Sequence, residues 1–197
     1  MVDAIYLLAG FGIILLASSF NFDKQLAKAF SKLEKTGFWK VIFAMSSTAF
    51  IACTLLVVAG LMFFLPSSKK AGLEGVWLLV TGIMANFVVT YVIKFMVRRK
   101  RQKGEEYIKF TKIPDYSFPS SHSSLAFVVY ALIGSHFTWL KIIWLVFATY
   151  LAFGRLYLEE HYLSDVIAGI LLGYYCGVIF AGSGLAAKAF QRITLCS

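Results

Sequence analysis

The polar residues that could do chemistry gather in three short clusters within a largely apolar sequence. In one of them, five residues separate Arg155 from His161 and three residues separate His161 from Asp165. A carboxylate one helical turn from a histidine can hold one imidazole nitrogen and fix its tautomer, which leaves the other nitrogen free to attack. A purely structural histidine–aspartate pair is the alternative interpretation, although nearly unbroken apolar sequence follows Asp165.

A second cluster, Pro119-Ser120-Ser121-His122, stands directly before an apolar run. A proline followed by serines is typical of a helix start, and Ser120 is the expected N-cap. The first turn of such a helix offers free backbone N–H groups and the positive end of its dipole, which together bind anions. His122 would lie beside this anion site. A capping motif with an incidental histidine is the plainer interpretation of this cluster taken alone.

The remaining cluster pairs Lys94 with Arg101, seven residues apart. If one helix continues through Arg101, the two side chains lie two turns apart and point the same way. The basic run 98–101 is equally typical of a lipid-headgroup anchor, and by itself it favours that interpretation.

The composition of the chain decides what kind of protein must position these clusters. Of 197 residues, 59% are hydrophobic and only 15% are charged, and the mean hydropathy is +0.76. Ordinary soluble domains carry far more charge, and the same figures exclude a disordered chain and a small disulfide scaffold. We therefore expect an integral membrane protein with a single domain over residues 1–197.

Continuous apolar runs of about the length needed to cross a bilayer, roughly 20 residues, predict helices rather than alternating barrel strands. The predicted spans are Ala4–Phe20, Phe38–Leu65, Leu73–Val97, Ser121–Phe137, Trp139–Leu158 and Tyr162–Gly182. The first run lacks the basic residues that precede the core of a signal peptide, so we expect it to be retained. The predicted fold is all-α, a bundle of six transmembrane helices.

Asn21–Lys35 carries apolar residues on one helical stripe and lysines on another. This pattern predicts a basic amphipathic helix on the membrane surface, and a plain connector with solvated lysines is the alternative. Most of the 19 basic residues would lie on the same side of the membrane as the three clusters. The positive-inside rule alone puts that side in the cytoplasm, but an anionic substrate would also explain the excess.

Together the three clusters resemble the signature motifs of the type 2 phosphatidic acid phosphatase family, which vanadium haloperoxidases share. The family motifs are Lys-(six residues)-Arg-Pro, Pro-Ser-Gly-His and Ser-Arg-(five residues)-His-(three residues)-Asp. The residues that match are Lys94, Arg101, Pro119, Ser120, His122, Arg155, His161 and Asp165. The chain departs from the motifs at Gln102, Ser121 and Gly154, which replace proline, glycine and serine.

The resemblance implies a division of labour among these residues. His161 would be the nucleophile that accepts the phosphoryl group as a phosphohistidine, with Asp165 orienting it. His122 would be the general acid that protonates the leaving group. The implied phosphate ligands are Lys94, Arg101, Arg155, Ser120 and Ser121. Neither a metal nor another cofactor is expected, because the cations and the helix N-terminus would supply the positive field.

The resemblance also implies a partner and a location. The substrate would be a lipid phosphate monoester or diphosphate, such as phosphatidylglycerophosphate, phosphatidic acid, undecaprenyl diphosphate or lipid A 1-phosphate. Contact with membrane lipids is expected and contact with nucleic acid is not, while the oligomeric state is left undetermined. Relatives of this kind favour a multi-pass protein of the inner (plasma) membrane with the site on the periplasmic face. A lipid phosphotransferase, a haloperoxidase and a non-catalytic lipid-binding protein are the alternatives.

Overall fold

The structure is a computed structural model that describes residues 2–33, 37–103, 114–133, 137–185 and 188–191. The regular secondary structure of these residues is helical, which confirms the all-α prediction over the described part of the chain. The helices are α1 (Val2–Ser31), α2 (Gly37–Met45), α3 (Thr48–Phe64), α4 (Lys69–Val97), α5 (Ser121–Leu132), α6 (Thr138–Tyr157) and α7 (Leu163–Gly182).

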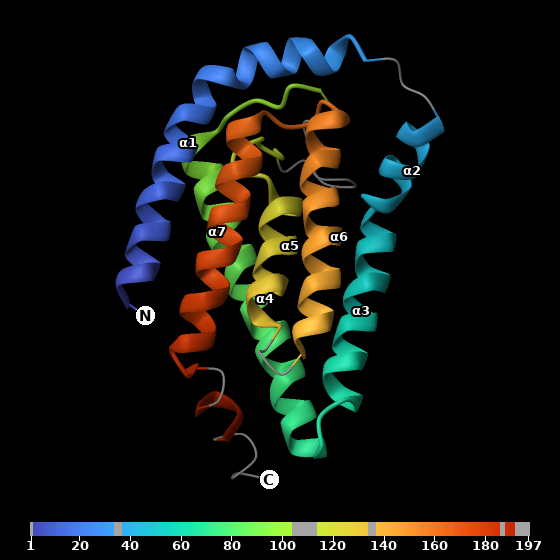
Figure 1. Cartoon of the computed structure of the whole chain (residues 1–197), viewed down its shortest axis with the longest axis vertical. Helices are drawn as coiled ribbons and strands as arrows, with labels where there is room; N and C mark the ends of the chain where they lie inside the picture. The colour runs from blue at the N-terminus through green and yellow to red at the C-terminus, as the bar shows by residue number, and fades with distance from the viewer. Residues whose placement is uncertain (1, 34–36, 104–113, 134–136, 186–187, 192–197) are drawn as a thin grey trace.

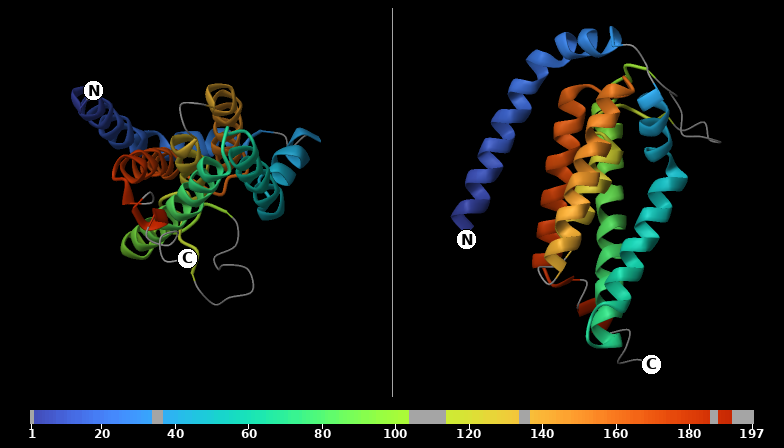
Figure 2. Two further views of the ribbon diagram at one scale, coloured as in Figure 1. Left: turned by 90° about the horizontal axis from the view of Figure 1, so that it is seen from below. Right: turned by 45° about the vertical axis from the view of Figure 1, so that its right-hand side comes forward.

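The short helix α5 lies at the centre of the bundle (Figures 1 and 2). It packs most extensively against α7 and also contacts α4 and α6, while α3 packs on α4 and α1 lies along the outside of α7. Val128, Val129 and Leu132 of α5 are fully buried and form the middle of the apolar core. The side chains of the first turn of α5 therefore lie among three other helices, α4, α6 and α7.

Three described helices are long and apolar enough to cross a membrane, namely α4, α6 and α7, and α5 and Ala49–Phe64 are shorter apolar helices. Large apolar side chains such as Met96 and Val146 point outward and are mostly exposed, as expected for surfaces that face lipid. The chain is therefore an integral membrane protein, and the count of six spans stays a prediction.

The predicted span Phe38–Leu65 is wrong as a single helix, because the structure divides it into α2 and α3. Ser47 adopts an extended conformation between them, and its side chain accepts a hydrogen bond of 3.3 Å from the backbone N–H of Phe50. A serine that caps a new helix in this way ends the one before it. The hydropathy of the run conceals this break because the flanking residues are uniformly apolar.

The predicted boundary at Phe20 is also wrong, because α1 continues without interruption from Val2 to Ser31. The helix bends, so that its second part passes over the start of α7 (Figures 1 and 2). Within that part Lys24 and Lys28 are exposed, as is Lys32 just beyond it, but so is Phe22, at 51%. The end of the predicted segment Asn21–Lys35 lies outside the described residues, and its role as a membrane-surface helix stays a prediction.

The other predicted spans agree more closely with the helices. α4 begins at Lys69 instead of Leu73, because the side chain of Ser68 caps its first turn. α5 ends at Leu132, since Ile133 is extended, so the predicted helix Ser121–Phe137 is too long. The helices α6 and α7 each lie within one residue of the predicted bounds.

The helix α4 does not continue through Arg101, which was the condition for Lys94 and Arg101 to point the same way. The helix stops at Val97, and Arg98 adopts a left-handed conformation with φ of 54°. A left-handed residue at this position ends a helix and redirects the chain. Arg101 therefore follows Lys94 through a turn and not along one helical face, so any meeting of the two depends on the loop.

A row of glycines lets α7 approach α5 closely. Gly169, Gly173 and Gly177 recur every four residues and face the backbone of α5, and a Cβ atom on Gly169 would lie 2.5 Å from the carbonyl oxygen of Ser120. Small residues at this spacing allow membrane helices to pack backbone against backbone. The contact brings the first turn of α5 against the first turn of α7, where the backbone N–H of Ser120 donates to the carbonyl of Asp165 at 2.9 Å.

Candidate active site

The residues of all three sequence clusters meet at one end of the bundle. The last turns of α4 and α6 and the first turns of α5 and α7 come together there, at the upper end in Figure 1. The imidazole of His122 lies within electrostatic range of four of the predicted site residues, which are Arg155, His161, Arg101 and Lys94. Segments more than sixty residues apart in sequence thus share one site.

The histidine–aspartate pair is buried, with His161 only 1% exposed and Asp165 not exposed at all. The Nδ1 atom of His161 lies 3.7 Å from Oδ2 of Asp165, which is beyond hydrogen-bond range. Ser117 fills the gap, because its hydroxyl lies 3.3 Å from that Nδ1 atom and donates to the same carboxylate oxygen. The pair is held through a third residue that the sequence motifs did not indicate.

The environment of His161 favours the neutral imidazole. Burial, together with the positive charges of Arg155 and Arg101, lowers the pKa of His161 to about 3 and outweighs the opposing effect of Asp165. At neutral pH the ring is therefore uncharged. Its Nε2 atom is buried and makes no hydrogen bond among the described residues. An unprotonated ring nitrogen held in this way is available as a nucleophile.

The first turn of α5 presents His122 and the two serines of the second cluster. The Nδ1 atom of His122 is buried and, among the residues described, also makes no hydrogen bond. Ser120 is fully buried and is the N-cap residue of α5, as predicted, but its side chain makes no capping bond to the helix. Its hydroxyl instead accepts a hydrogen bond of 3.2 Å from Ser123. Ser121 is half-buried at the start of the helix.

Lys94 is held on a buried polar face of α4. Asn86, Thr90 and Lys94 follow one another at four-residue intervals, and each is at most 3% exposed. The hydroxyl of Ser124 in α5 donates to Oδ1 of Asn86 at 2.8 Å and lies 3.2 Å from Oγ1 of Thr90. These contacts fix the rotation of α4 about its axis, so the ammonium group of Lys94 points into the site.

Two carboxylates bind the three predicted phosphate-binding cations. Asp115 lies 3.0 Å from Nζ of Lys94 and 2.5 Å from Nη2 of Arg101. Glu160 lies 3.3 Å from Nη1 of Arg101 and forms a close ion pair with Arg155. Buried cations gathered this closely require counter-charges. Neither Asp115 nor Glu160 was identified from the sequence. For Glu160 the available signal was its position directly before His161.

Arg99 is a further residue that sequence reasoning placed elsewhere, within a headgroup anchor. Its Nη1 atom donates to Oδ1 of Asp165 at 2.8 Å and to the hydroxyl of Ser164 at 2.6 Å. Its Nη2 atom donates to Oδ2 of Asp23 at 2.8 Å. The guanidinium group therefore connects α1 with the aspartate of the candidate site, and it is not free to anchor a lipid.

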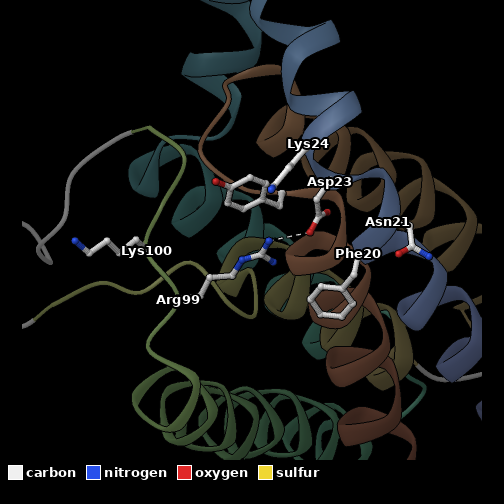
Figure 3. A pocket seen from close by; sticks show the side chains of 7 residues that line it. Phe20, Asn21, Asp23, Lys24, Arg99 and Lys100 are labelled. Carbon is white, nitrogen blue, oxygen red and sulfur yellow. Dashed lines mark hydrogen bonds and ion pairs between the residues drawn. The ribbon is translucent and has the colours of Figure 1, made fainter.

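A pocket of about 560 Å³ opens beside Arg99, on the side where α1 bends (Figure 3). The residues that line it are Phe20, Asn21, Asp23, Lys24, Arg99, Lys100 and Tyr162. Neither His122 nor His161 is among them, so this pocket is separate from the two histidines. In the part of the chain that the structure describes, no group of three or more histidine, cysteine or acidic residues is placed to hold a metal ion.

Comparison with known proteins identifies related chains. An undecaprenyl-diphosphatase of Sulfolobus acidocaldarius is 29% identical over a match covering 58% of this chain and 65% of that protein, just under two thirds of its length. The crystal structure of a transmembrane PAP2-type phosphatidylglycerolphosphate phosphatase from Bacillus subtilis superimposes with a TM-score of 0.67 at 21% identity, covering 93% of this chain and 96% of the other. LpxE of Aquifex aeolicus gives 0.60 at 21% identity, covering 82% and 95%.

The two structures show that the fold is shared, since their sequences are too distant to show more. The sequence model of the PAP2 superfamily matches residues 75–185, which is more than half of the chain and includes every residue of the three clusters. On this match the chain belongs to the PAP2 superfamily, the family that its motifs resemble.

Proposed function

We propose that the protein is an integral-membrane phosphatase that removes phosphate from a lipid phosphate monoester or diphosphate. One observation carries the proposal. Among the described residues, Nε2 of His161, Nδ1 of His122 and Nε of Arg155 are buried without hydrogen-bond partners. Buried polar atoms without partners are costly, and here they belong to the three residues that would act together on one phosphoryl group.

In the first step, Nε2 of His161 attacks the phosphorus atom. A phosphorus–nitrogen bond forms as the bond between phosphorus and the lipid oxygen breaks, and protonated His122 transfers its proton to the leaving oxygen. The negative charge of the bound substrate favours the protonated form of His122. Asp165, with Ser117, holds the other nitrogen of His161, so the ring keeps its orientation during attack.

In the second step, a water molecule attacks the phosphohistidine. His122, now neutral, takes a proton from that water, the phosphorus–nitrogen bond breaks, and inorganic phosphate leaves. His161 returns to its neutral form and His122 to its protonated form, so the cycle closes. The chain supplies every group that these steps use, and the proposal assigns no metal or other cofactor to them.

The phosphate-binding groups in this proposal are Lys94, Arg101, Arg155, Ser120 and Ser121. Phosphoryl transfer spreads negative charge over the oxygens around phosphorus, and fixed cations stabilise that charge. The three cations contact Asp115 and Glu160, so a substrate phosphate must exchange with carboxylates. Charge-assisted hydrogen bonds to a phosphate with more charge and more oxygens favour this exchange.

The proposed substrate class is a phosphorylated lipid, with phosphatidylglycerophosphate, phosphatidic acid, undecaprenyl diphosphate and lipid A 1-phosphate as candidates. The functions of two relatives support the class: one is an undecaprenyl-diphosphatase and another a phosphatidylglycerolphosphate phosphatase. The position of the site at the ends of the apolar helices supports it too, because a lipid can present its phosphate there without leaving the membrane. The proposal includes six spans, one domain and a site on the periplasmic face of the inner membrane.

Phosphate release from the four candidate lipids, measured with purified protein in detergent and EDTA, tests the proposal. We expect release from at least one lipid and its loss in His161→Ala, with His136→Ala, at the chain's remaining histidine, as the control. Transfer of phosphate to an added acceptor lipid in preference to water would indicate a phosphotransferase. Equal phosphate release from His161→Ala and the wild-type protein would contradict the catalytic role of His161, and a wild-type protein inactive on all four lipids would contradict the proposed function.

A further inference from the structure

Arg99, in the loop before α5, lies half-buried where that loop meets α1 and the first turn of α7. Its guanidinium group contacts the carboxylate of Asp23 at 2.8 Å, as Figure 3 shows, and that of Asp165 at 2.8 Å. The ring of Tyr162 lies 4.2 Å from the guanidinium carbon and that of Phe20 5.6 Å from it. Neighbouring aromatic rings and ion pairs from two different guanidinium nitrogens together hold an arginine in one orientation.

Asp23 completes this junction from α1 and is 4% exposed. Its Oδ1 atom accepts a hydrogen bond of 2.9 Å from the backbone N–H of Ser164, and its Oδ2 atom accepts one of 2.5 Å from the Ser164 hydroxyl. Asp23 therefore caps the start of α7 from a different helix. Burial disfavours the charge of Arg99, but the hydrogen bonds and charges of Asp23 and Asp165 outweigh it and raise the pKa of Arg99 above its ordinary value.

The two oxygens of Asp165 have separate tasks. Oδ2 accepts hydrogen bonds from Ser117 and from the backbone N–H of Tyr162 at 2.9 Å, and it is the oxygen nearest His161. Oδ1 accepts from Arg99. If Arg99 were removed, a fully buried carboxylate oxygen would lose this donor, and the carboxylate would rotate or take up a proton. Either change disturbs the contact with His161.

We propose that Arg99 is a positioning residue that fixes the carboxylate of Asp165 for His161, and that Asp23 of α1 fixes Arg99 in turn. The inference rests on the proposed function and adds to it. Arg99 donates directly to Asp165, the partner of His161, whereas Lys94, Arg101 and Arg155 contact Asp115 and Glu160 and are the proposed phosphate ligands. The bent helix α1, which contributes no residue to the sequence motifs, thereby becomes part of the catalytic arrangement.

Steady-state kinetics of four variants test the proposal. We expect Arg99→Ala to lower kcat on the order of 10- to 100-fold, the usual cost of losing the outer partner of an oriented ligand or base, with a much smaller change in KM. Arg99→Lys keeps the charge but cannot reach all three acceptors, so it should lie between. Asp23→Asn should lower kcat less than Arg99→Ala. Lys100→Ala, at the exposed neighbour that lines the same pocket, is the matched control and should keep the wild-type kcat.

The pH profile separates positioning from a general structural role. The groups that interact electrostatically with Asp165 are His161, Lys94 of α4 and Arg99, and Asp23 is connected to it through its hydrogen bond with Arg99. Without Arg99 the carboxylate protonates more readily, so the acid limb of kcat should move to higher pH in Arg99→Ala and stay unchanged in Lys100→Ala. A raised KM with wild-type kcat would make Arg99 a substrate ligand and overturn the proposal. Loss of activity with an unchanged pH profile would make it structural and also overturn the proposal.

A measurement that does not depend on turnover keeps this inference distinct from the proposed function. The chain contains three histidines, so ¹⁵N-histidine spectra of the protein in detergent can resolve His161 when compared with His161→Gln. We expect one tautomer with unprotonated Nε2 in the wild-type protein and a mixture in Arg99→Ala. An identical His161 spectrum in both would overturn the positioning role, even if the protein were inactive on every lipid tested.

Discussion

Glu160 directly precedes the proposed nucleophile, His161, in the sequence. Its carboxylate binds two of the proposed phosphate ligands, Arg155 and Arg101. Glu160→Gln removes this negative charge while keeping the size of the side chain. Inorganic phosphate should then inhibit more strongly, with its competitive inhibition constant lowered about tenfold, which corresponds to about 1.4 kcal/mol. The measurement is inhibition of lipid-phosphate hydrolysis by phosphate at constant ionic strength, because salt screens such interactions.

The neighbouring Glu159 offers the control for this prediction. It is buried and pairs with the exposed Lys103 at 2.6 Å, outside the group of three cations. Glu159→Gln should leave the inhibition constant of phosphate unchanged. An unchanged constant in Glu160→Gln, or an equal shift in both variants, would contradict the view that substrate phosphate exchanges with the carboxylate of Glu160.

His161 also makes the stability of the protein depend on pH. Its pKa is lowered to about 3 in the folded protein, whereas an exposed histidine titrates near pH 6.5. Between these values the unfolded chain holds the extra proton, so the free energy of unfolding falls as the pH drops from 6.5, by at most about 1.4 kcal/mol per pH unit. Thermal unfolding in detergent at pH 7.5 and 5 should show a smaller loss of stability in His161→Gln. Equal losses in both proteins would contradict the buried neutral state.

At the scale of the elements, the contact between α5 and α7 decides whether the site forms. A Cβ atom on Gly173 would clash with the carbonyl oxygen of Ser124, so Gly173→Ala must push the helices apart. We expect a loss of stability of about 1–3 kcal/mol, the usual cost of overpacking, together with lower activity, because the link from Ser120 to Asp165 lengthens. Thermal unfolding and phosphate release measure the two effects.

Gly182, at the other end of the same helix, is the matched control because nothing lies within 4 Å of the Cβ position there. Gly182→Ala should keep both the stability and the activity of the wild-type protein. If Gly173→Ala were equally harmless, the close approach of the two helices would not be what positions the site.

The helix boundaries show where sequence patterns reach their limit. α6 and α7 match the predicted spans within one residue, because a polar segment interrupts the apolar sequence at both ends. The break between α2 and α3 and the continuity of α1 were not predicted. In the sequence Ser47 is an ordinary polar residue, and its capping role is seen only from its hydrogen bond with Phe50. The path of α1 involves contacts with α7, whose residues lie far along the chain.

At the scale of the whole molecule, the site lies at one end of the bundle, and the start of α1 and the end of α7 lie toward the other (Figure 1). If the site faces the periplasm, a reporter fused to the C-terminus must be cytoplasmic. We expect a fluorescent-protein fusion to be bright and an alkaline phosphatase fusion to be inactive. The opposite result would put the site in the cytoplasm, where the excess of basic residues by itself would place it.

The class of protein, the candidate site residues and their family could all be predicted from the amino-acid sequence alone. These follow from local properties, since apolar length, an interval of four residues between His161 and Asp165 and the order of the motifs can all be read along the chain. Which charges pair with one another could be seen only in the folded protein. Asp115, Glu160 and Arg99 found their partners through the meeting of four helix ends and a loop, and Asp23 reached Ser164 across 141 positions of sequence. Partner choice among charged side chains depends on distance through space, and here that distance is set by which helix ends and loop come together.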